Sequence, residues 1–363
     1  MRLALDEQIF AVQAYGGISR DFVEQARAMR HSPAFNVEIL PLRAPVVNEF
    51  ILQDPELAEH FAVRRASSPY EALAHYWRRR RRTEEVDIIH HTFYLPRGLG
   101  DYPGARRIST VHDMIPELFP KSRRRLDLLT RKLAYVRGSD QLICVSESTR
   151  NDLLRVYPEI RVPITVAYPG VSSEFTPLAA KLENVAHPYL LHVGNRAGYK
   201  DGATLLSAFL DIASRFPDLI LLFVGGGELT AWERRLIAHS RVDQERIKQL
   251  SLPDHLIPSA YAHATITVFP SQYEGFGLPA VEAMACGSPL VLAKSSSLPE
   301  VGGDAAVYFP PGDHRVLSKI LIDLLDDVGH RREMVSQGLH RSKAFTWDAY
   351  AQANMLAYTQ VLD

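Results

Sequence analysis

The chain has 363 residues, which is too many for one ordinary hydrophobic core and predicts two domains of about 150–200 residues each. Its composition is typical of a soluble globular protein, and a formal net charge of −1 gives no electrostatic reason to expect nucleic acid as a partner. No apolar run approaches the roughly 20 residues of a membrane span, no signal sequence is evident and only two cysteines occur, so a reducing cytoplasm is the expected compartment.

The first half of the chain alternates short apolar runs with helical patterns, which favours a parallel sheet flanked by helices. This alternation is less regular than in the second half. Strands are predicted at Val37–Leu40, Val86–His90, Arg107–Val111, Gln141–Val145 and Ile164–Ala167. Helices are predicted at Ile18–Arg30, Tyr70–Arg81 and Arg123–Arg137.

A pair of glycines, Gly16 and Gly17, precedes the first predicted helix. Tandem glycines let a backbone approach a ligand closely and leave N–H groups free to bind it. The alternative is an ordinary turn, which is the more frequent use of such a pair.

Two basic runs lie in the first half. Arg78–Arg82 contains five consecutive arginines, and Lys121–Arg125 reads Lys-Ser-Arg-Arg-Arg. Either run is able to face an anionic membrane surface or a polyphosphate. The alternative, a solvated helix face, is slightly favoured for each run taken alone.

Histidines follow or end two of the predicted strands. His112 and Asp113 come directly after the strand that ends at Val111, where a histidine either contacts a ligand or serves as a satisfied structural residue. His90 and His91 lie at the end of the preceding strand and are interpreted as lining a cleft or as core, and not as metal ligands.

The second half begins after Tyr168–Val171, where a strand ends and an irregular segment opens, so the domain boundary is predicted near residue 170. Here the alternation is clear and indicates a parallel sheet covered on both faces. Strands are predicted at Tyr189–Val193, Leu219–Val224, Thr265–Phe269 and Leu290–Ala293, and helices at Gly202–Phe216, Glu228–His239, Pro279–Cys286 and, at the end of the chain, Thr346–Asp363.

Two cations follow the first strand of this half. Arg196 and Lys200 lie in a loop that begins at Gly194, and Asp201 is placed to cap the next helix. Open α/β sheets bind ligands at the carboxyl ends of their strands, so these cations could neutralise a departing diphosphate. The alternative is two loop cations without a ligand. The glycines around Gly226 also follow a strand, but they do not complete the dinucleotide-binding spacing G-x-G-x-x-G.

The run from Glu274 to Glu282, Glu-Gly-Phe-Gly-Leu-Pro-Ala-Val-Glu, carries most of the functional information. It follows a buried strand and opens a helix in which Pro279 suits the first turn. A strand–loop–helix unit directs free N–H groups and the positive helix end toward an anion, typically a phosphate. Glu274 on the loop and Glu282 one turn into the helix can then reach one ligand.

This run resembles the E-x7-E signature of family-4 retaining glycosyltransferases. The Arg196 and Lys200 pair and the Pro169-Gly170-Val171 linker are similar to the same family. The resemblance implies an α/β fold of the GT-B type, which has two Rossmann-like doubly wound domains with a cleft between them. Residues 1–170 would form the acceptor domain and residues 171–345 the nucleotide-sugar donor domain, with the helix 346–363 packing back on the first.

The resemblance also implies roles for single residues. Glu274 would contact hydroxyls of the transferred sugar, Glu282 would hold the ribose, and Arg196 and Lys200 would bind the diphosphate. His112 would contact the transferred sugar. The remaining donor-binding residues would be Gly16, Gly17, Gly194, Gly226, Phe276, Gly277 and Leu278, and lesser acceptor candidates are Asp113 and His91.

The implied activity is retaining transfer of a hexose, preferably mannose, from a nucleotide-diphosphate sugar. A GDP-sugar is favoured over a UDP-sugar as donor, and a saccharide or lipid-linked oligosaccharide of surface-polysaccharide (O-antigen) synthesis as acceptor. The basic runs could then make a peripheral contact with the inner membrane face. No cofactor beyond the donor is expected, and no metal, since the sequence contains no Asp-x-Asp pair.

Two other functions remain open from the sequence. A GT-B sugar-nucleotide epimerase or hydrolase would use the same donor site without an acceptor. A non-catalytic partner subunit of a polysaccharide-synthesis complex would keep the fold without turnover, although the joint presence of Glu274, Glu282, Arg196 and Lys200 argues against an idle site.

Overall fold

The computed structural model describes residues 1–32, 35–42, 44–78, 84–96, 98–119, 123–183, 185 and 188–363, without the side chains of residues 123–126. The chain divides into two compact units. The N-terminal unit comprises Met1–Gly170 together with Thr346–Asp363, and the C-terminal unit comprises Val171–Phe345.

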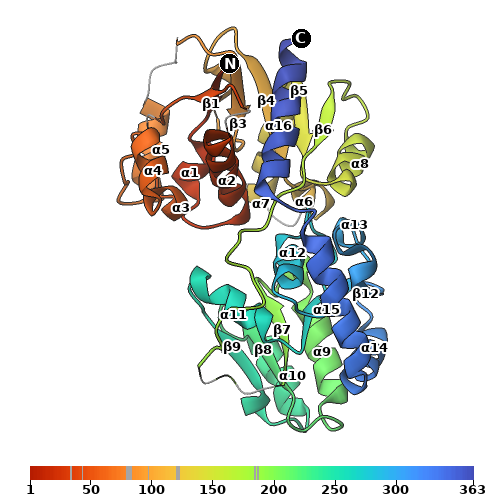
Figure 1. Ribbon diagram of the computed structural model, residues 1–363. Helices are drawn as coiled ribbons and strands as arrows, with labels where there is room; N and C mark the ends of the chain where they lie inside the picture. Colours follow the sequence, from red (N-terminus) through yellow and green to blue (C-terminus); the bar gives the residue numbers. More distant parts are fainter. Residues whose placement is uncertain are drawn as a thin grey trace. The chain divides into compact units, whose positions relative to one another are not determined.

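The N-terminal unit is built on a sheet of six parallel strands in the order β2-β1-β3-β4-β5-β6 (Figure 1). Its strands are β1 (Arg2–Leu5), β2 (Glu38–Ile39), β3 (Ile88–His91), β4 (Arg106–Val111), β5 (Gln141–Cys144) and β6 (Ile164–Val166). Its helices are α1 (Gln8–Val12), α2 (Gly17–His31), α3 (Glu49–Leu52), α4 (Pro55–His60), α5 (Pro69–Arg78), α6 (Ile115–Leu118), α7 (Arg123–Gly138), α8 (Glu147–Val156) and α16 (Trp347–Leu362).

The last helix of the chain, α16, belongs to this unit. It packs against α2 and against β5 and β6, and Figure 1 shows it in dark blue lying along these strands. Tyr350 and Tyr358 of α16 are fully buried in the same apolar core as Phe22. At the start of α16 the backbone is so close to Gly170 that a Cβ there would lie 2.3 Å from the backbone nitrogen of Trp347, which leaves room for glycine alone.

The C-terminal unit has a second sheet of six parallel strands in the order β12-β11-β10-β7-β8-β9. If β7 is counted as the first strand of this sheet and the sheet is read from its β9 edge, the strand order is 3-2-1-4-5-6. This is the order of doubly wound dinucleotide-binding domains. The strand order reverses between β7 and β10. The strands are β7 (Tyr189–Val193), β8 (Ile220–Val224), β9 (Ile247–Leu250), β10 (Ile266–Phe269), β11 (Leu290–Ala293) and β12 (Ala306–Phe309).

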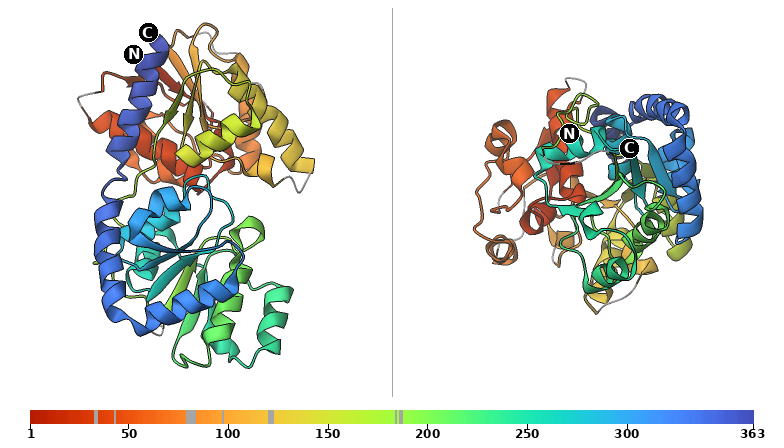
Figure 2. Two further views of the ribbon diagram at one scale, coloured as in Figure 1. Left: turned by 90° about the vertical axis from the view of Figure 1, so that its right-hand side faces the viewer. Right: turned by 90° about the horizontal axis from the view of Figure 1, so that it is seen from below.

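Helices cover both faces of this second sheet, as Figure 2 shows, with α9 beside α14 and α12 beside α15. They are α9 (Gly202–Ile212), α10 (Ala231–His239), α11 (Ile257–Ala262), α12 (Leu278–Ala285), α13 (Leu298–Gly302), α14 (His314–Asp326) and α15 (Val328–Ser342). The strands between them are buried, and β8, Ile-Leu-Leu-Phe-Val, is apolar throughout, as expected for a strand with helices on both faces.

The predicted α/β class with parallel, doubly wound sheets is confirmed. Three strands were not predicted: β1, β9 and β12. Strands β9 and β12 lie at the edges of their sheet and are half-buried, so Lys248 and Gln249 interrupt the apolar run in β9. The helix predicted at Tyr70–Arg81 is present as α5, and residues 79–81 lie outside the described residues.

A buried hydroxyl joins α16 to the rest of the N-terminal unit. Tyr358 Oη lies 2.6 Å from His90 Nδ1 and accepts a hydrogen bond from Gln25 Nε2. Burial lowers the pKa of His90 to about 3, so its ring is neutral at pH 7. The hydroxyl therefore satisfies two polar groups that have no access to water.

We expect Tyr358→Phe to lower the free energy of unfolding by about 1–3 kcal/mol, because the buried His90 and Gln25 side chains lose this partner. Equilibrium urea unfolding of the full chain measures the change. Tyr70→Phe is the matched control, since the side chain of Tyr70 is 79% exposed. Equal stability of the two variants would contradict the expectation.

Candidate active site

The topology of the C-terminal unit brings two loops together at one edge of its sheet. Strands β7 and β10 are parallel neighbours, with Ile266 opposite Leu190 and Thr267 opposite Leu191. Their carboxyl ends therefore meet where the strand order reverses, which is where doubly wound sheets bind ligands. The loop after β7 carries Arg196 and Lys200, and the loop after β10 carries Glu274.

Lys200 and Glu274 form an ion pair across this reversal point. Lys200 Nζ donates to both carboxylate oxygens of Glu274, at 2.7 Å each. The side chains are 24% and 12% exposed, so the pair is largely shielded and still reachable by a ligand. The structure thus brings together two of the predicted site residues that are 74 positions apart in sequence.

The Glu274 loop is held in place by the loop that follows β11. Ser296 Oγ accepts a hydrogen bond from the Glu274 N–H at 2.8 Å, and Ser297 Oγ lies 3.0 Å from the Glu274 carbonyl and 2.8 Å from that of Phe276. Ser296 has a left-handed backbone with φ +46°, which costs a non-glycine residue free energy. These serines fix the backbone on both sides of Glu274.

Arg196 has a different set of partners from the diphosphate that the family resemblance implies. Its guanidinium donates to Glu233 Oε1 at 2.9 Å and to the carbonyls of Gly225, Gly227 and Glu228 at 3.0 Å each. The side chain is buried, and it lies over the ring of Phe223. Diphosphate contact therefore stays a prediction, and it would require Arg196 to release some of these groups.

These contacts shape the glycine loop after β8. Gly225, Gly226 and Gly227 all have positive φ, from +71° to +81°, and their conformation turns the Gly225 and Gly227 carbonyls onto Arg196. A Cβ on Gly226 would lie 2.8 Å from the Gly194 carbonyl oxygen. The sequence Gly-Gly-Gly is thus required by backbone conformation and by close approach to the loop that begins at Gly194.

Helix α12 carries the second glutamate of the motif. Gly277 precedes it with φ +101° and Leu278 is its first residue. Glu282 is 8% exposed, and Tyr261 Oη donates to its Oε2 at 3.2 Å. Phe276 is buried and packs edge-on against Phe345. Its side chain therefore stabilises the loop, and contact with a ligand is left to its backbone.

In the N-terminal unit, α2 begins one residue earlier than predicted, so that Gly16 is the residue before the helix and Gly17 is its first residue. His112 follows β4, and its Nδ1 lies 3.3 Å from Asp21 Oδ2 of α2. Asp113 Oδ1 accepts the Ile115 N–H at 2.8 Å, at the start of α6. Asp113 therefore shapes the chain beside His112.

His91 is 1% exposed, and its Nδ1 is 2.8 Å from Asp6 Oδ2. This burial favours the core role that the sequence left open over contact with an acceptor. Asp201 corrects a smaller expectation: it occupies the position before α9, but its side chain accepts from Thr204 Oγ1 and Gln272 Nε2 and caps no backbone N–H.

The predictions about the basic runs, a membrane span and a metal site concern features that the structure describes only in part. Within the basic runs, Arg79–Arg82, Lys121 and Ser122 lie outside the described residues, and no side chains are described for Arg123–Arg125. Nowhere in the described part of the chain is a helix both long and apolar enough to cross a membrane. In that same part, no three His, Cys, Asp or Glu side chains gather as a metal site would require.

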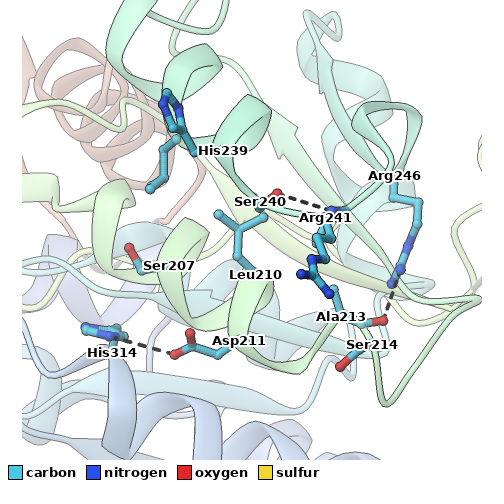
Figure 3. Close-up of a pocket in the computed structure, with 12 residues that line it drawn as sticks. Ser207, Leu210, Asp211, Ala213, Ser214, His239, Ser240, Arg241, Arg246 and His314 are labelled. Atoms are coloured by element: carbon cyan, nitrogen blue, oxygen red, sulfur yellow. Dashed lines mark hydrogen bonds and ion pairs between the residues drawn. The ribbon is translucent and has the colours of Figure 1, made fainter.

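A cavity of about 680 Å³ lies elsewhere in the C-terminal unit, around the C-terminal half of α9 and the end of α10 (Figure 3). Asp211, on its wall, is nine residues beyond the start of α9, or about 14 Å along the helix. Of the two arginines that line it, Arg241 and Arg246, the second already donates to the carbonyls of Ala213, Phe216 and Leu219. This cavity is therefore distinct from the reversal point that holds Lys200 and Glu274.

Four residues of the site region were missed from the sequence: Glu233, Ser296, Ser297 and Asp21. Glu233 alone carries a local signal. With Thr230 it forms a capping box at the start of α10, and the Thr-x-x-Glu spacing is recognisable. Its second role, holding Arg196, depends on the tertiary contact between the loops after β7 and β8.

We expect Glu233→Ala to lower the free energy of unfolding by about 3–5 kcal/mol, because it leaves the buried Arg196 charge without its carboxylate. Burial opposes ionisation of Glu233, but hydrogen bonds from Arg196 and Thr230 outweigh it and lower its pKa. The stabilisation is then fully present above the ordinary Glu value of about 4.3 and is lost as pH falls through the lowered pKa. Chemical unfolding of the wild type and of Glu233→Ala, measured from pH 7 downward, tests this. Glu245→Ala, at an exposed position, is the control. If the difference in unfolding free energy between wild type and Glu233→Ala vanished above pH 5, the expectation would be contradicted.

Comparison with known proteins identifies the family of the chain. The model of the family Glycosyl transferases group 1 matches residues 178–341, and that of Glycosyltransferase Family 4 matches residues 15–175. The chain is 31% identical to O-antigen chain mannosyltransferase B of Escherichia coli over 292 residues, covering 75% of this chain and 74% of that protein. It is 27% identical to D-inositol 3-phosphate glycosyltransferase of Thermobifida fusca, covering 76% and 70%.

Among solved structures, the sucrose-phosphate synthase of Thermosynechococcus elongatus is similar in fold, with a TM-score of 0.71 and 21% identity, over 99% of this chain and 98% of that one. Each unit's parallel sheet thus has a counterpart in a glycosyltransferase of the GT-B fold. The chain belongs to the family-4 glycosyltransferases and has the GT-B fold.

Proposed function

We propose that this glycosyltransferase is a retaining, metal-independent hexosyltransferase that takes its sugar from a nucleotide diphosphate. The observation that carries the proposal is the Lys200–Glu274 ion pair at the reversal point of the donor-unit sheet. A cation beside the N-terminus of α9 suits a diphosphate. A carboxylate beside it suits the hydroxyls of the attached sugar.

Donor binding would replace the ion pair with two new contacts. The diphosphate oxygens would take Lys200, and the sugar hydroxyls would donate hydrogen bonds to Glu274. A nucleoside diphosphate without its sugar offers a partner to Lys200 only and leaves the Glu274 carboxylate unpaired. The pair therefore favours the intact donor over the spent one.

In the proposed reaction, the acceptor hydroxyl oxygen bonds to the anomeric carbon on the face from which the diphosphate leaves. The bond between that carbon and the diphosphate oxygen breaks, and the acceptor proton passes to the departing diphosphate. Lys200 and the N-terminus of α12 would stabilise the charge that develops on the leaving group. Glu282 would hold the ribose, and His112 would contact the transferred sugar.

Mannose is the sugar we favour, and GDP the nucleotide. The similarity to an enzyme named as an O-antigen chain mannosyltransferase supports mannose and a saccharide or lipid-linked acceptor in surface-polysaccharide synthesis. A cytoplasmic protein that meets the inner membrane face through its basic runs would fit such an acceptor.

We expect one nucleotide class to raise the melting temperature selectively when GDP, UDP, ADP and dTDP are compared with their sugar conjugates. A ligand at a hundred times its Kd adds about 2.7 kcal/mol of stability. GDP and GDP-mannose are the expected ligands, with the larger shift from GDP-mannose when the two are compared at the same concentration. Selective stabilisation by UDP species would overturn the GDP choice, and no shift with any nucleotide would count against the enzyme.

We expect Glu274→Gln to lower kcat for transfer about 100-fold or more, because the sugar hydroxyls lose a charged acceptor that is positioned in advance. Release of nucleoside diphosphate, measured with saccharide and lipid-linked acceptors present, follows the reaction. Glu245→Gln removes an exposed carboxylate from the same unit and serves as control. Wild-type turnover in Glu274→Gln at subsaturating donor would rule out the assigned role.

A further inference from the structure

Among its described residues, the N-terminal unit has two Asp–His pairs, and they differ in how well the carboxylate is satisfied. Asp6, paired with His91, also accepts from the Thr92 N–H at 2.9 Å and the Thr92 hydroxyl at 2.7 Å. These contacts outweigh burial and lower the pKa of Asp6. Both oxygens of Asp6 are occupied, whereas His91 Nε2 is buried without a hydrogen-bond partner, as His112 Nε2 is. The two pairs therefore differ at the carboxylate, and the satisfied carboxylate of Asp6 suits a core role.

In the second pair, Asp21 and His112, two polar atoms lack a hydrogen-bond partner. Asp21 Oδ2 lies 3.3 Å from His112 Nδ1, and the side chains are 5% and 10% exposed. Asp21 Oδ1 and His112 Nε2 are both buried and have no hydrogen-bond partner. A buried polar atom without a partner calls for an explanation, such as a ligand or a water molecule that completes its hydrogen bonds.

The ring of His112 is fixed from two directions by consecutive residues of α2. Asp21 holds Nδ1, and Phe22 packs edge-on against the ring with centroids 5.7 Å apart. With Nδ1 turned to α2, Nε2 is the only ring nitrogen left for a ligand. His112 also follows β4 at the carboxyl end of the parallel sheet, which is the ligand-binding edge.

The charge of the pair decides what Nε2 offers. If Asp21 and His112 together are neutral, either the ring carries both protons, or the carboxyl group holds one and donates it to Nδ1. In both arrangements Nε2 carries a proton and is a donor. The pair with one net negative charge would instead leave Nε2 as an acceptor, and burial penalises that charge.

The neighbouring titratable groups do not reverse this balance. His90 of β3 is neutral at pH 7 because burial lowers its pKa to about 3. Burial raises the pKa of Tyr350 of α16 well above its ordinary value, so that it is neutral too. Arg20 of α2 lies near enough to interact with Asp21. Burial raises the pKa of Asp21 despite His112 and Arg20, which agrees with a carboxylate short of partners.

We propose that Asp21 is a positioning residue that keeps a proton on His112 Nε2, so that His112 donates a hydrogen bond to an oxygen of the transferred sugar. The inference rests on the proposed function for the identity of that oxygen. The state of the pair itself is independent of substrate.

Kinetics of Asp21→Asn and Asp21→Ala test the proposal. Both variants are expected to lower kcat/KM for the donor about 10-fold or more at pH 8, because the ring loses the carboxylate that retains its proton. Wild-type kcat/KM in both variants would overturn the proposal.

Two controls separate positioning from folding. Glu24→Gln removes another carboxylate of α2, one that pairs with Arg27, and should leave kcat/KM for the donor unchanged. In a His112→Gln background, whose amide donates without help, Asp21→Asn should cost little more, so the two substitutions should be non-additive. Full additivity would contradict action through His112.

A measurement without substrate distinguishes this proposal from the proposed function. In spectra of the full chain labelled with ¹⁵N-histidine, His112 Nε2 should carry a proton in the wild type, and Asp21→Asn should lower the fraction of molecules in which it does. If no nucleotide sugar supports transfer but the spectra show this shift, the proposed function fails and the pair stands. If transfer occurs and His112 Nε2 is unprotonated in the wild type, the proposed function stands and the proposed role of Asp21 is rejected.

Discussion

The ion pair between Lys200 and Glu274 depends on the reversal of strand order between β7 and β10. Because these strands are parallel neighbours, the loops that follow them rise from the same edge and their side chains meet. Neither loop forms the site alone. The cation comes from the loop before α9 and the carboxylate from the loop before α12, and Ser296 and Ser297, from the loop after β11, hold the second loop at its backbone.

Arg196 has a separate task at the same edge. A guanidinium has five N–H groups, and four hydrogen bonds tie this one to Glu233 and three carbonyls of the glycine loop. A buried arginine with these partners fixes the loop after β8 relative to the loop after β7. Lysine would supply the charge but not the planar guanidinium that reaches α10 and the loop after β8 at once.

Much of this arrangement was predictable from the sequence. Apolar runs such as Tyr189–Val193 and Leu290–Ala293 coincide with strands because strands buried on both faces are apolar throughout. Strand β9 was missed because an edge strand tolerates Lys248 and Gln249. The Glu274 motif was recognisable because its glycine and proline positions are dictated locally, as the positive φ of Gly277 shows. The partners of Arg196 and His112 were not, since Glu233 and Asp21 approach them only through tertiary folding.

The two cations that the sequence assigned to one diphosphate therefore differ in kind. Arg196 is neutralised by Glu233 in the interior, where separating the charges would leave both without solvent. Lys200 is neutralised by a carboxylate that is itself a proposed ligand of the sugar, so one binding event can give both groups new partners. Because each group passes directly from one partner to another, donor binding leaves neither Lys200 nor Glu274 without a partner. Lys200 is thus the cation better suited to meet and release a diphosphate on each turnover, and Arg196 the one suited to keep the glycine loop in one shape throughout.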